Sequence, residues 1–443
     1  MRRVLLVAVL LLVAGCSAPT QTTPAAQTQS TTPDAGSAAT GTLTYDGANL
    51  AYNGTRVLRD VERLRGLNAT GTITVSEFSG STSPPYDVPD RFAGIRQAGA
   101  VALGLYTNAT ARAGQALGVT YAGPLVRIRT PGTLDRFPQQ VVLAHELTHA
   151  LQYQHGFRAV RLATSGVLKT DGSLAVRAVV EGDAELTAVQ YRNESFPETP
   201  LPVTRVGNVT RARWQYAFSA SMYQYGYQYY RSVGTTVAAR NTSLSHPPQT
   251  TRGLLHPGIN DTRPSLPDSP QSARFDAVHA DTIGELGVRL ALRANGVSKQ
   301  NASRAAFGWR NDRMTYYGHT RNASVRWLSV WQNDTEAREF ANAWTTMLGH
   351  RNASLENGAY VVPATNTTPR FVSIVHRVGK TVLVTAGTNA SRVRALAHLS
   401  SSRNVSNSSS TASSSTSATA SSTASSVSVS ASADSASPSS RSP

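Results

Sequence analysis

Two histidines four residues apart in a helical pattern constrain this chain more than any other feature. Residues 138–156 begin with a proline, continue with good helix formers and end with a glycine, which predicts a helix. At about 3.6 residues per turn, His145 and His149 share one face with Cβ atoms about 5–6 Å apart, so both imidazoles can reach one metal ion. Glu146 follows His145 and stays within a water molecule's reach of that ion. The spacing therefore predicts two metal ligands and a general base.

A second helical pattern, over residues 173–191, supplies the acidic residues that a third ligand requires. Glu181 and Glu185 are four residues apart on one face, among apolar residues where an unpaired acid is costly to bury. Glu181 follows the second histidine by enough chain to turn and return alongside the first helix, so we expect it to be the third ligand. Glu185 is expected to accept the free ring N–H of a ligand histidine. The alternative for Glu185 is a solvent-facing acid paired with Arg177 or Arg192.

The two helical segments carry the specific motif of this sequence, which reads His145-Glu146-Leu147-Thr148-His149-Ala150-Leu151-Gln152 followed by Val180-Glu181-Gly182-Asp183-Ala184. Together they resemble the gluzincin-type zinc metallopeptidases, and more closely a family of secreted prokaryotic lipoproteins that includes archaeal surface proteins. Looser similarities to that family occur at 223–226, 247–257, 284–287 and 305–313. The resemblance implies a zincin-like core with an active-site helix, a Zn²⁺ cofactor, and hydrolysis of peptide bonds in a peptide or protein substrate.

In such a site Glu146 takes a proton from a water molecule that the metal activates and delivers it to the leaving amine. A further donor must stabilise the oxyanion, and Tyr223 or His256 is the candidate; the alternatives are tyrosine packing in a helix and a simple turn at His256. Asp183 is expected at the surface or in helix packing. His155 is expected as a cation at the end of the first helix.

The arrangement of apolar patterns indicates an α+β protein with strands at both ends and helices in the middle. Leu125–Arg129 alternates like a half-buried strand, and we expect it to be an edge strand that pairs with substrate backbone. Phe371–Val375 and Thr381–Val384 predict a β-hairpin near the C-terminus, while Ile283–Leu292 and Thr335–Leu348 predict helices.

The two ends of the chain differ from its middle. Residues 1–16 combine an arginine pair, a short apolar run and small residues before Cys16, which is typical of an export signal and resembles a prokaryotic lipobox. We therefore expect cleavage before Cys16, lipid on its sulfur and a membrane-anchored protein at the cell surface, with the export route left open. Residues 17–40 predict a flexible Thr/Pro/Ala-rich linker, and residues 400–443 a disordered Ser/Thr/Ala-rich tail. The folded region is thus 41–399, as one domain or two subdomains.

Composition narrows the partners further. The 443-residue chain has a formal net charge of +16, almost all from arginine, which suits nucleic acid, an anionic surface or only a solvated exterior. No recognition helix or RNA-binding motif accompanies the charge, so we expect no nucleic-acid partner. The chain has one cysteine, which excludes an internal disulfide, Cys-rich zinc fingers and iron–sulfur clusters. The oligomeric state stays open.

Glycosylation sequons recur along the chain and, behind an export signal, suggest a surface glycoprotein. The alternative is chance in a Ser/Thr-rich composition. The first five sequons are Asn53, Asn68, Asn108, Asn193 and Asn208.

Three classes of function remain after this reading. The first is a lipid-anchored zinc peptidase. The second is a surface protein that binds zinc without turnover and acts in adhesion or envelope upkeep. The third is a basic surface-binding module in which His145 and His149 are structural. Zinc content separates the third class from the others, and a protease assay separates the first from the second.

Overall fold

The computed structural model describes residues 41–78, 90–107, 117–121, 125–129, 138–200, 203–272, 274–318 and 323–399. All of these residues belong to one compact unit. The expected signal peptide with Cys16, the linker, the C-terminal tail and the sequon at Asn108 lie outside the described residues. Among the helices described, none is both long and apolar enough to cross a membrane.

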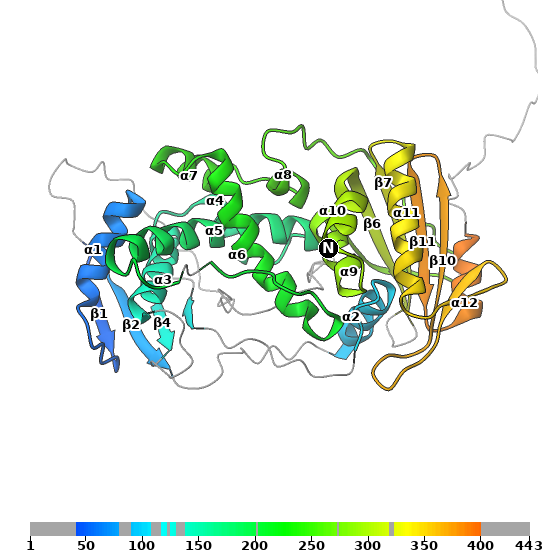
Figure 1. Ribbon diagram of the computed structural model, residues 1–443, viewed down its shortest axis with the longest axis horizontal. Coiled ribbons are helices and arrows are strands. Elements are labelled where there is room, and N and C mark those ends of the chain that lie inside the picture. Colours follow the sequence, from blue (N-terminus) through cyan, green and yellow to red (C-terminus); the bar gives the residue numbers. More distant parts are fainter. Residues whose placement is uncertain are drawn as a thin grey trace, which may run out of the picture. The chain divides into compact units, whose positions relative to one another are not determined.

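The fold is α+β, as expected, with a four-stranded sheet from the first part of the chain, a seven-stranded sheet from the last part, and helices between them (Figure 1). The strands are β1 (Leu43–Asp46), β2 (Ile73–Phe78), β3 (Gly118–Thr120), β4 (Leu125–Arg129), β5 (Ala277–Asp281), β6 (Trp309–Tyr317), β7 (Ser324–Trp331), β8 (Ser354–Glu356), β9 (Ala359–Val362), β10 (Phe371–Val378) and β11 (Thr381–Gly387). The helices are α1 (Gly54–Arg65), α2 (Asp90–Ala102), α3 (Gln139–Gln154), α4 (Arg158–Thr164), α5 (Thr170–Ser195), a 3₁₀ turn η1 (Arg211–Arg213), α6 (Trp214–Val233), α7 (Val237–Ser245), α8 (Thr251–Leu255), α9 (Gly284–Ala294), α10 (Lys299–Phe307), α11 (Asp334–Gly349) and α12 (Ala390–Ala397).

The four-stranded sheet has the order β1-β2-β4-β3. Strands β1, β2 and β4 are parallel, and β3 pairs antiparallel to β4 with Val119 opposite Arg127. The strand expected over Leu125–Arg129 is present as β4, but it lies inside the sheet rather than at its edge. The outer position belongs to β3, a three-residue strand that is too short to leave a sequence pattern.

Helix α3 packs on this sheet because its leucines share one side of the helix. Leu143, Leu147 and Leu151 are fully buried in a core with residues of β2, β4 and α1. His155 caps the C-terminal end, and Gly156 follows with a φ of 61°, a left-handed conformation that ends the helix at little cost. His145 and His149 are thereby held on a face turned away from the sheet core.

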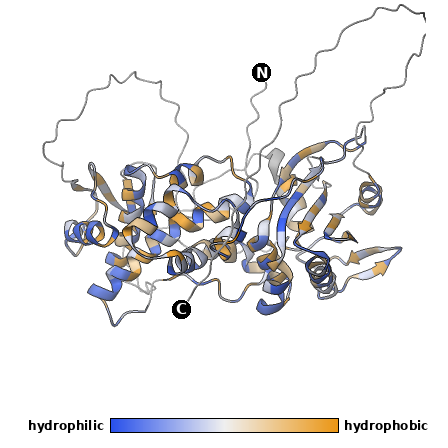
Figure 2. Cartoon of the chain, turned by 90° about the horizontal axis from the view of Figure 1, so that it is seen from above, coloured by the Kyte–Doolittle hydropathy of each residue, from blue (hydrophilic) through white to orange (hydrophobic). Residues whose placement is uncertain are grey.

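Helix α5 belongs to both of the larger hydrophobic cores of the described unit. Ala188 and Tyr191 pack with the four-stranded sheet, while Leu174 and Val179 pack with α6, α9 and the seven-stranded sheet. In Figure 1, α5 accordingly runs between the two sheets. Figure 2 shows hydrophobic and hydrophilic residues mixed along the helices, as elements buried on one side require.

Two glycines allow α5 and α6 to approach closely. A Cβ on Gly226 of α6 would lie 1.8 Å from the carbonyl oxygen of Ala178. A Cβ on Gly182 of α5 would lie 2.2 Å from the carbonyl carbon of Gly226. This contact sets the position of the tyrosines on α6 relative to the ligands on α5.

The seven-stranded sheet has the order β5-β6-β7-β11-β10-β9-β8 and is antiparallel throughout. The expected C-terminal hairpin is formed by β10 and β11, with Val375 opposite Val384. The two helices expected within 283–348 are also present, as α9 and α11. Helix α11 covers the sheet through Phe340 and Trp344, whose rings contact Trp327 of β7.

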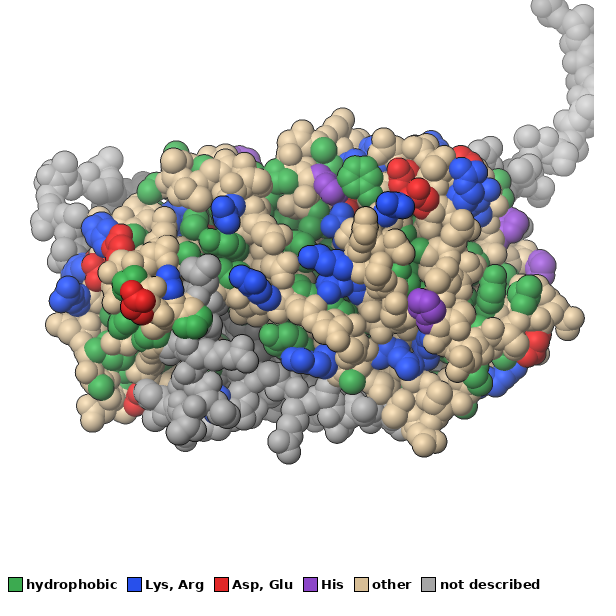
Figure 3. All heavy atoms as spheres, in the orientation of Figure 1, with side chains coloured by type: hydrophobic (Ala, Val, Ile, Leu, Met, Phe, Trp, Pro, Cys, Tyr) green, Lys and Arg blue, Asp and Glu red, His purple; other side chains and the backbone are tan. Residues whose placement is uncertain are grey.

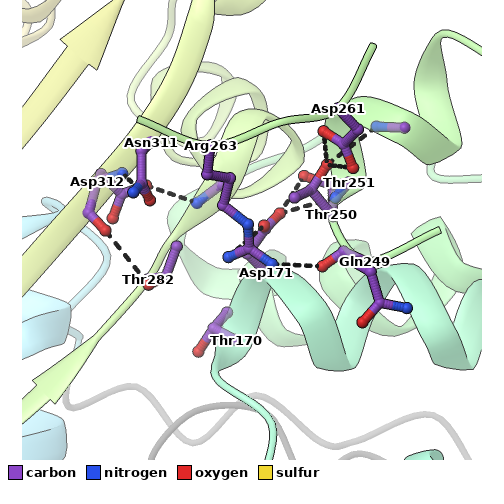
Figure 4. Close-up of polar contacts among 12 residues, drawn as sticks. Thr170, Asp171, Gln249, Thr250, Thr251, Asp261, Arg263, Thr282, Asn311 and Asp312 are labelled. Atoms are coloured by element: carbon purple, nitrogen blue, oxygen red, sulfur yellow. Dashed lines mark hydrogen bonds and ion pairs between the residues drawn. The ribbon is translucent and has the colours of Figure 1, made fainter. Parts of the chain in front are cut away.

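Aspartates join the first turn of α5 to this second sheet. Asp281, which ends β5, accepts hydrogen bonds from the backbone N–H and the hydroxyl of Thr170 at 2.9 and 2.5 Å. Asp171 in turn accepts from the backbone N–H and the hydroxyl of Thr251 in α8 at 2.8 and 2.6 Å (Figure 4). Asp312 of β6 caps α9 at Ile283. The helix that carries Glu181 is thus anchored at its start by Asp281, which accepts from Thr170, and by Asp171, which accepts from Thr251.

Candidate metal centre

Three donor atoms from α3 and α5 converge on one point. The Nε2 atoms of His145 and His149 are 3.1 Å apart, and the Oε2 atom of Glu181 lies 3.3 and 3.2 Å from them. All three side chains are largely buried. Together they form a buried group that could hold a metal ion.

The tautomer of His149 follows from its neighbour Gln152. The amide nitrogen of Gln152 donates to the backbone oxygen of Val180 at 3.0 Å and to Oδ2 of Asp183 at 2.8 Å. Its amide oxygen therefore faces Nδ1 of His149, 2.8 Å away, and Nδ1 must be the donor. The lone pair of His149 then lies on Nε2, the atom that points at Glu181, and this is the form that metal ligation requires.

His145 is held between Glu185 and Tyr223. Its Nδ1 lies 3.5 Å from Oε2 of Glu185, while the other Glu185 oxygen accepts from the backbone N–H of Thr204 at 2.9 Å. The ring of Tyr223, from α6, stacks on the His145 ring with centroids 5.8 Å apart and an interplanar angle of 27°. Glu185 therefore faces a histidine of the group, and Tyr223 lies at its side.

Glu146 lies between the histidines and β3. The hydroxyl of Thr120 is 2.7 Å from Oε2 of Glu146 and 2.9 Å from its backbone oxygen. A Cβ on Gly118 would lie 2.7 Å from Oε1 of Glu146, so only glycine leaves room for this carboxylate. The short outer strand thus positions Glu146 on one side.

Burial and the neighbouring charges shift the pKa values of the side chains in this group. Burial lowers the pKa of His145, but Glu181, Glu185 and Glu146 outweigh it, and the pKa ends well above its ordinary value. Burial would raise the pKa of Glu181, but the two imidazoles outweigh it and the pKa ends well below its usual range. Burial raises the pKa of Glu146. Several carboxylates around two imidazoles give this centre an excess of negative charge that a cation would balance.

Asp183 is buried and not at the surface, so of the two positions expected for it only helix packing holds. Its side chain is bonded to Nε of Arg65 at 2.8 Å and to Nε of Arg240 at 2.6 Å, and all three side chains are fully buried. These arginines come from α1 and α7. Through Gln152, the same aspartate is also linked to His149.

The structure places His256 elsewhere. Its Nε2 lies 2.8 Å from Oε1 of Glu285 in α9, which also pairs with Arg289. Its ring contacts Phe307 edge-on, with centroids 5.0 Å apart. Of the two expected oxyanion donors, the structure brings Tyr223 to the ligand group and brings His256 to this separate cluster. The loop that carries His256 follows α8, and no sequence pattern indicates where it lies.

Gln152 and Thr120 contribute to the metal centre by contacting His149 and Glu146, and the sequence analysis did not predict either role. Gln152 lies three residues after His149, a spacing that places both on one helix face, so this signal was available. Thr120 belongs to a strand of three residues, and nothing in the sequence connects it to Glu146. The described sequon residues Asn53, Asn68, Asn193 and Asn208 are all exposed.

The donor set fits zinc. Ligands on one tetrahedral zinc ion at about 2.0–2.1 Å lie about 3.3 Å from one another, close to the 3.1–3.3 Å among these three atoms. Two imidazoles and one carboxylate suit zinc and similar transition metals, whereas calcium and magnesium prefer oxygen ligands. The partners of His149 and His145 hold each Nδ1, which leaves both Nε2 atoms for the metal.

Comparisons with known proteins reach only the C-terminal part of the chain. Residues 273–397 match a family model described as a domain of unknown function (DUF8575). This range contains β5 to α12 and does not include the ligands on α3 and α5. The chain matches no curated protein and no solved structure. The geometry of the site is therefore the feature of this chain that points to a function.

Proposed function

We propose that this protein is a zinc-dependent metallopeptidase with a zincin-like core. The observation that carries the proposal is the convergence of His145 Nε2, His149 Nε2 and Glu181 Oε2 on one point, with Glu146 beside them. Three protein ligands leave a fourth position of a tetrahedral ion open to water or substrate, which is typical of catalytic zinc sites. Bound zinc supplies a Lewis acid that polarises a peptide carbonyl and acidifies a water molecule.

Proton transfer, stabilisation of the oxyanion and orientation of His145 are assigned to other side chains of the site. The hydroxyl of Thr120 lies within hydrogen-bond distance of Oε2 of Glu146. Oε1 is therefore the atom that takes the proton from the attacking water and passes it to the leaving nitrogen. Tyr223, against His145, is the candidate donor to the oxyanion. Glu185 faces Nδ1 of His145 and fixes the orientation of that ring.

The position of strand β3 favours a peptide as the substrate. In the part of the chain that the structure describes, β3 pairs with β4 on one side and has no strand on the other. Its backbone groups at Gly118–Thr120 lie next to Glu146, and an extended peptide added to this edge would pass directly by the base.

Metal analysis tests the centre. The full chain should contain about one zinc per molecule, and His149→Ala should contain none, because the two remaining donors hold zinc weakly. His155→Ala is the matched control, since His155 is bonded to the backbone oxygen of Asn68 and not to the ligand group. Absence of zinc from the wild-type chain would overturn both the peptidase and any zinc-binding role.

A peptidase assay then separates turnover from binding. Glu146→Gln should keep its zinc and lose hydrolysis by about 10²-fold or more, because the amide cannot take the proton. Wild-type turnover in this variant would contradict the mechanism. A wild-type chain that holds zinc but cleaves no member of a peptide library would instead be a zinc-binding surface protein.

We also propose that the protein is exported and lipid-anchored through Cys16, with its folded part at the cell surface. The support for this step is the signal sequence alone. Cys16→Ser should move the protein from the membrane fraction to the soluble fraction. Deglycosylation should lower the mass if sequons such as Asn53, Asn68 and Asn193 carry glycan, and a mass equal to the bare chain would contradict glycosylation.

A further inference from the structure

A cavity of about 700 Å³, open to solvent on one side, lies between the segment that precedes α6 and the turn that joins α9 to α10. One wall is formed by residues 207–212 and the other by residues 293–299, apart from Asn295. Neither wall includes a ligand of the candidate metal centre, since those residues belong to α3 and α5. Its volume suits a small organic molecule rather than a single ion.

The charged side chains that line this cavity are all basic. They are Arg211, Arg293 and Lys299, and the lining contains no aspartate or glutamate. Lys299 is one of only three lysines in the chain. Figure 3 shows Lys and Arg side chains over the middle of the face where α6 and α9 lie in Figure 1, and also towards its two ends, where Asp and Glu side chains lie near them.

These cations have no carboxylate partner within 4.0 Å among the described residues, unlike Arg63 and Arg377, which pair with Glu194 and Asp334. Arg293 donates instead to the backbone oxygen of Gly207 at 2.8 Å, across the cavity. Burial lowers the pKa of Arg351 to about 10, and the charge of Arg211 contributes to that lowering. Three cations that line one cavity, with no carboxylate in its lining, favour an anion there.

The cavity also offers hydrogen-bond donors. Lys299 begins α10, a nine-residue helix, and Ser298 caps it by accepting from Asn301. The backbone N–H groups of the first turn give this end of the helix a partial positive charge. Asn208 and Thr210 add exposed polar side chains to the opposite wall.

We propose that this cavity binds a small ligand carrying two or more oxyanion groups, either phosphates or carboxylates. A single negative charge would balance only one of the three cations, and a volume of about 700 Å³ accommodates a larger anion. The site is separate from the metal centre and does not depend on peptidase activity.

Calorimetric titration at low ionic strength tests the proposal, with inorganic pyrophosphate and citrate as probes. The full chain is produced in a host that does not glycosylate, because a glycan on Asn208 would enter the cavity. At least one probe should bind, and Arg211→Gln and Lys299→Gln should each weaken binding about five-fold or more. Binding of pyrophosphate alone identifies a phosphate site, and binding of citrate alone identifies a carboxylate site.

Two controls separate this site from the rest of the molecule. Lys380→Gln removes the same charge from the turn of the C-terminal hairpin and should leave the affinity unchanged. His149→Ala should also leave it unchanged, because both probes can bind zinc and this variant removes that route. Absence of binding, equal losses in Lys380→Gln, or loss of binding in His149→Ala would each overturn the proposal. Melting temperatures that stay above the titration temperature in every variant exclude unfolding as the cause.

Discussion

Two buried clusters of charge lie two residues apart on α5 and differ in kind. Around Asp183, one carboxylate faces two arginines, and each of its oxygens accepts from a guanidinium. Around Glu181, several carboxylates face two imidazoles, and three donor atoms point at one another at 3.1–3.3 Å. The first cluster has an excess of positive charge, and the second has an excess of negative charge.

The difference shows how a structural ion network can be told from a binding site. In the Asp183 cluster, guanidinium donors meet a carboxylate and join α1, α5 and α7, while Nη1 of Arg65 stays without a hydrogen-bond partner among the described residues. In the Glu181 cluster, three carboxylates face two imidazoles, and a cation held by the two Nε2 atoms and Glu181 would balance the excess of negative charge. Gln152 bonds to both clusters, so the Asp183 cluster can position His149 in the Glu181 cluster.

The largest expected effect comes from breaking the Asp183 cluster. Asp183→Ala leaves Arg65 and Arg240 buried without a counter-charge and should lower the free energy of unfolding by about 3–5 kcal/mol. Urea denaturation measures the change. The control is Asp60→Ala, whose partner Arg63 is exposed, and it should cost no more than about 1 kcal/mol. Similar losses in the two variants would contradict the comparison.

The second-largest effect is expected at the contact between α5 and α6, which brings Tyr223 close to the ligands. Gly226→Ala places a methyl group against the carbonyl of Ala178, so the helices must separate, at a cost of about 1–3 kcal/mol. Zinc should still bind, while catalysis should fall as Tyr223 moves from His145. The control is Gly349→Ala in the last turn of α11, where a Cβ meets nothing within 4 Å and stability should rise or stay equal. Thermal unfolding and kcat, measured together, check both effects.

A smaller effect tests the link between the clusters. Gln152→Leu removes the acceptor for Nδ1 of His149 and should weaken zinc binding about 10–100-fold, or about 1.4–2.7 kcal/mol. Competition with a chromophoric chelator gives the affinity. Gln154→Leu, on the same helix but bonded to the backbone of Thr70, should not change it. Unchanged affinity in Gln152→Leu would show that the two clusters act independently.

The smallest effect concerns the aspartates that anchor α5. Burial raises the pKa of Asp171 to about 7, and the hydrogen bonds from Thr251 and the charge of Arg263 only partly oppose it. The folded chain keeps a proton that the unfolded chain releases above 3.8, so this stabilisation is full below about pH 4 and is lost as the pH rises through about 7. Asp171→Asn should flatten the dependence of unfolding free energy on pH over this range. Asp268→Asn, fully exposed, should leave the wild-type profile intact.

The sequence predicted what depends on local periodicity. Both helices, the placement of His145 and His149 on one face, the return of Glu181 to them and the C-terminal hairpin follow from spacing and apolar pattern. It did not predict β3 as the outer strand, because three residues carry no pattern. It did not place Asp183 or His256, because the partners of both lie on elements that only the tertiary fold brings near.

Membership of α5 in both cores has a consequence for how the protein opens. Its first turn is tied to β5 by Asp281, and its later residues pack under the four-stranded sheet, so it cannot fray from either end without exposing a core. Backbone amides near Glu181 should therefore exchange with solvent only when the whole unit unfolds, and they should be among the slowest in the protein. We therefore expect helix α5, which carries Glu181, to unfold only together with the rest of the unit.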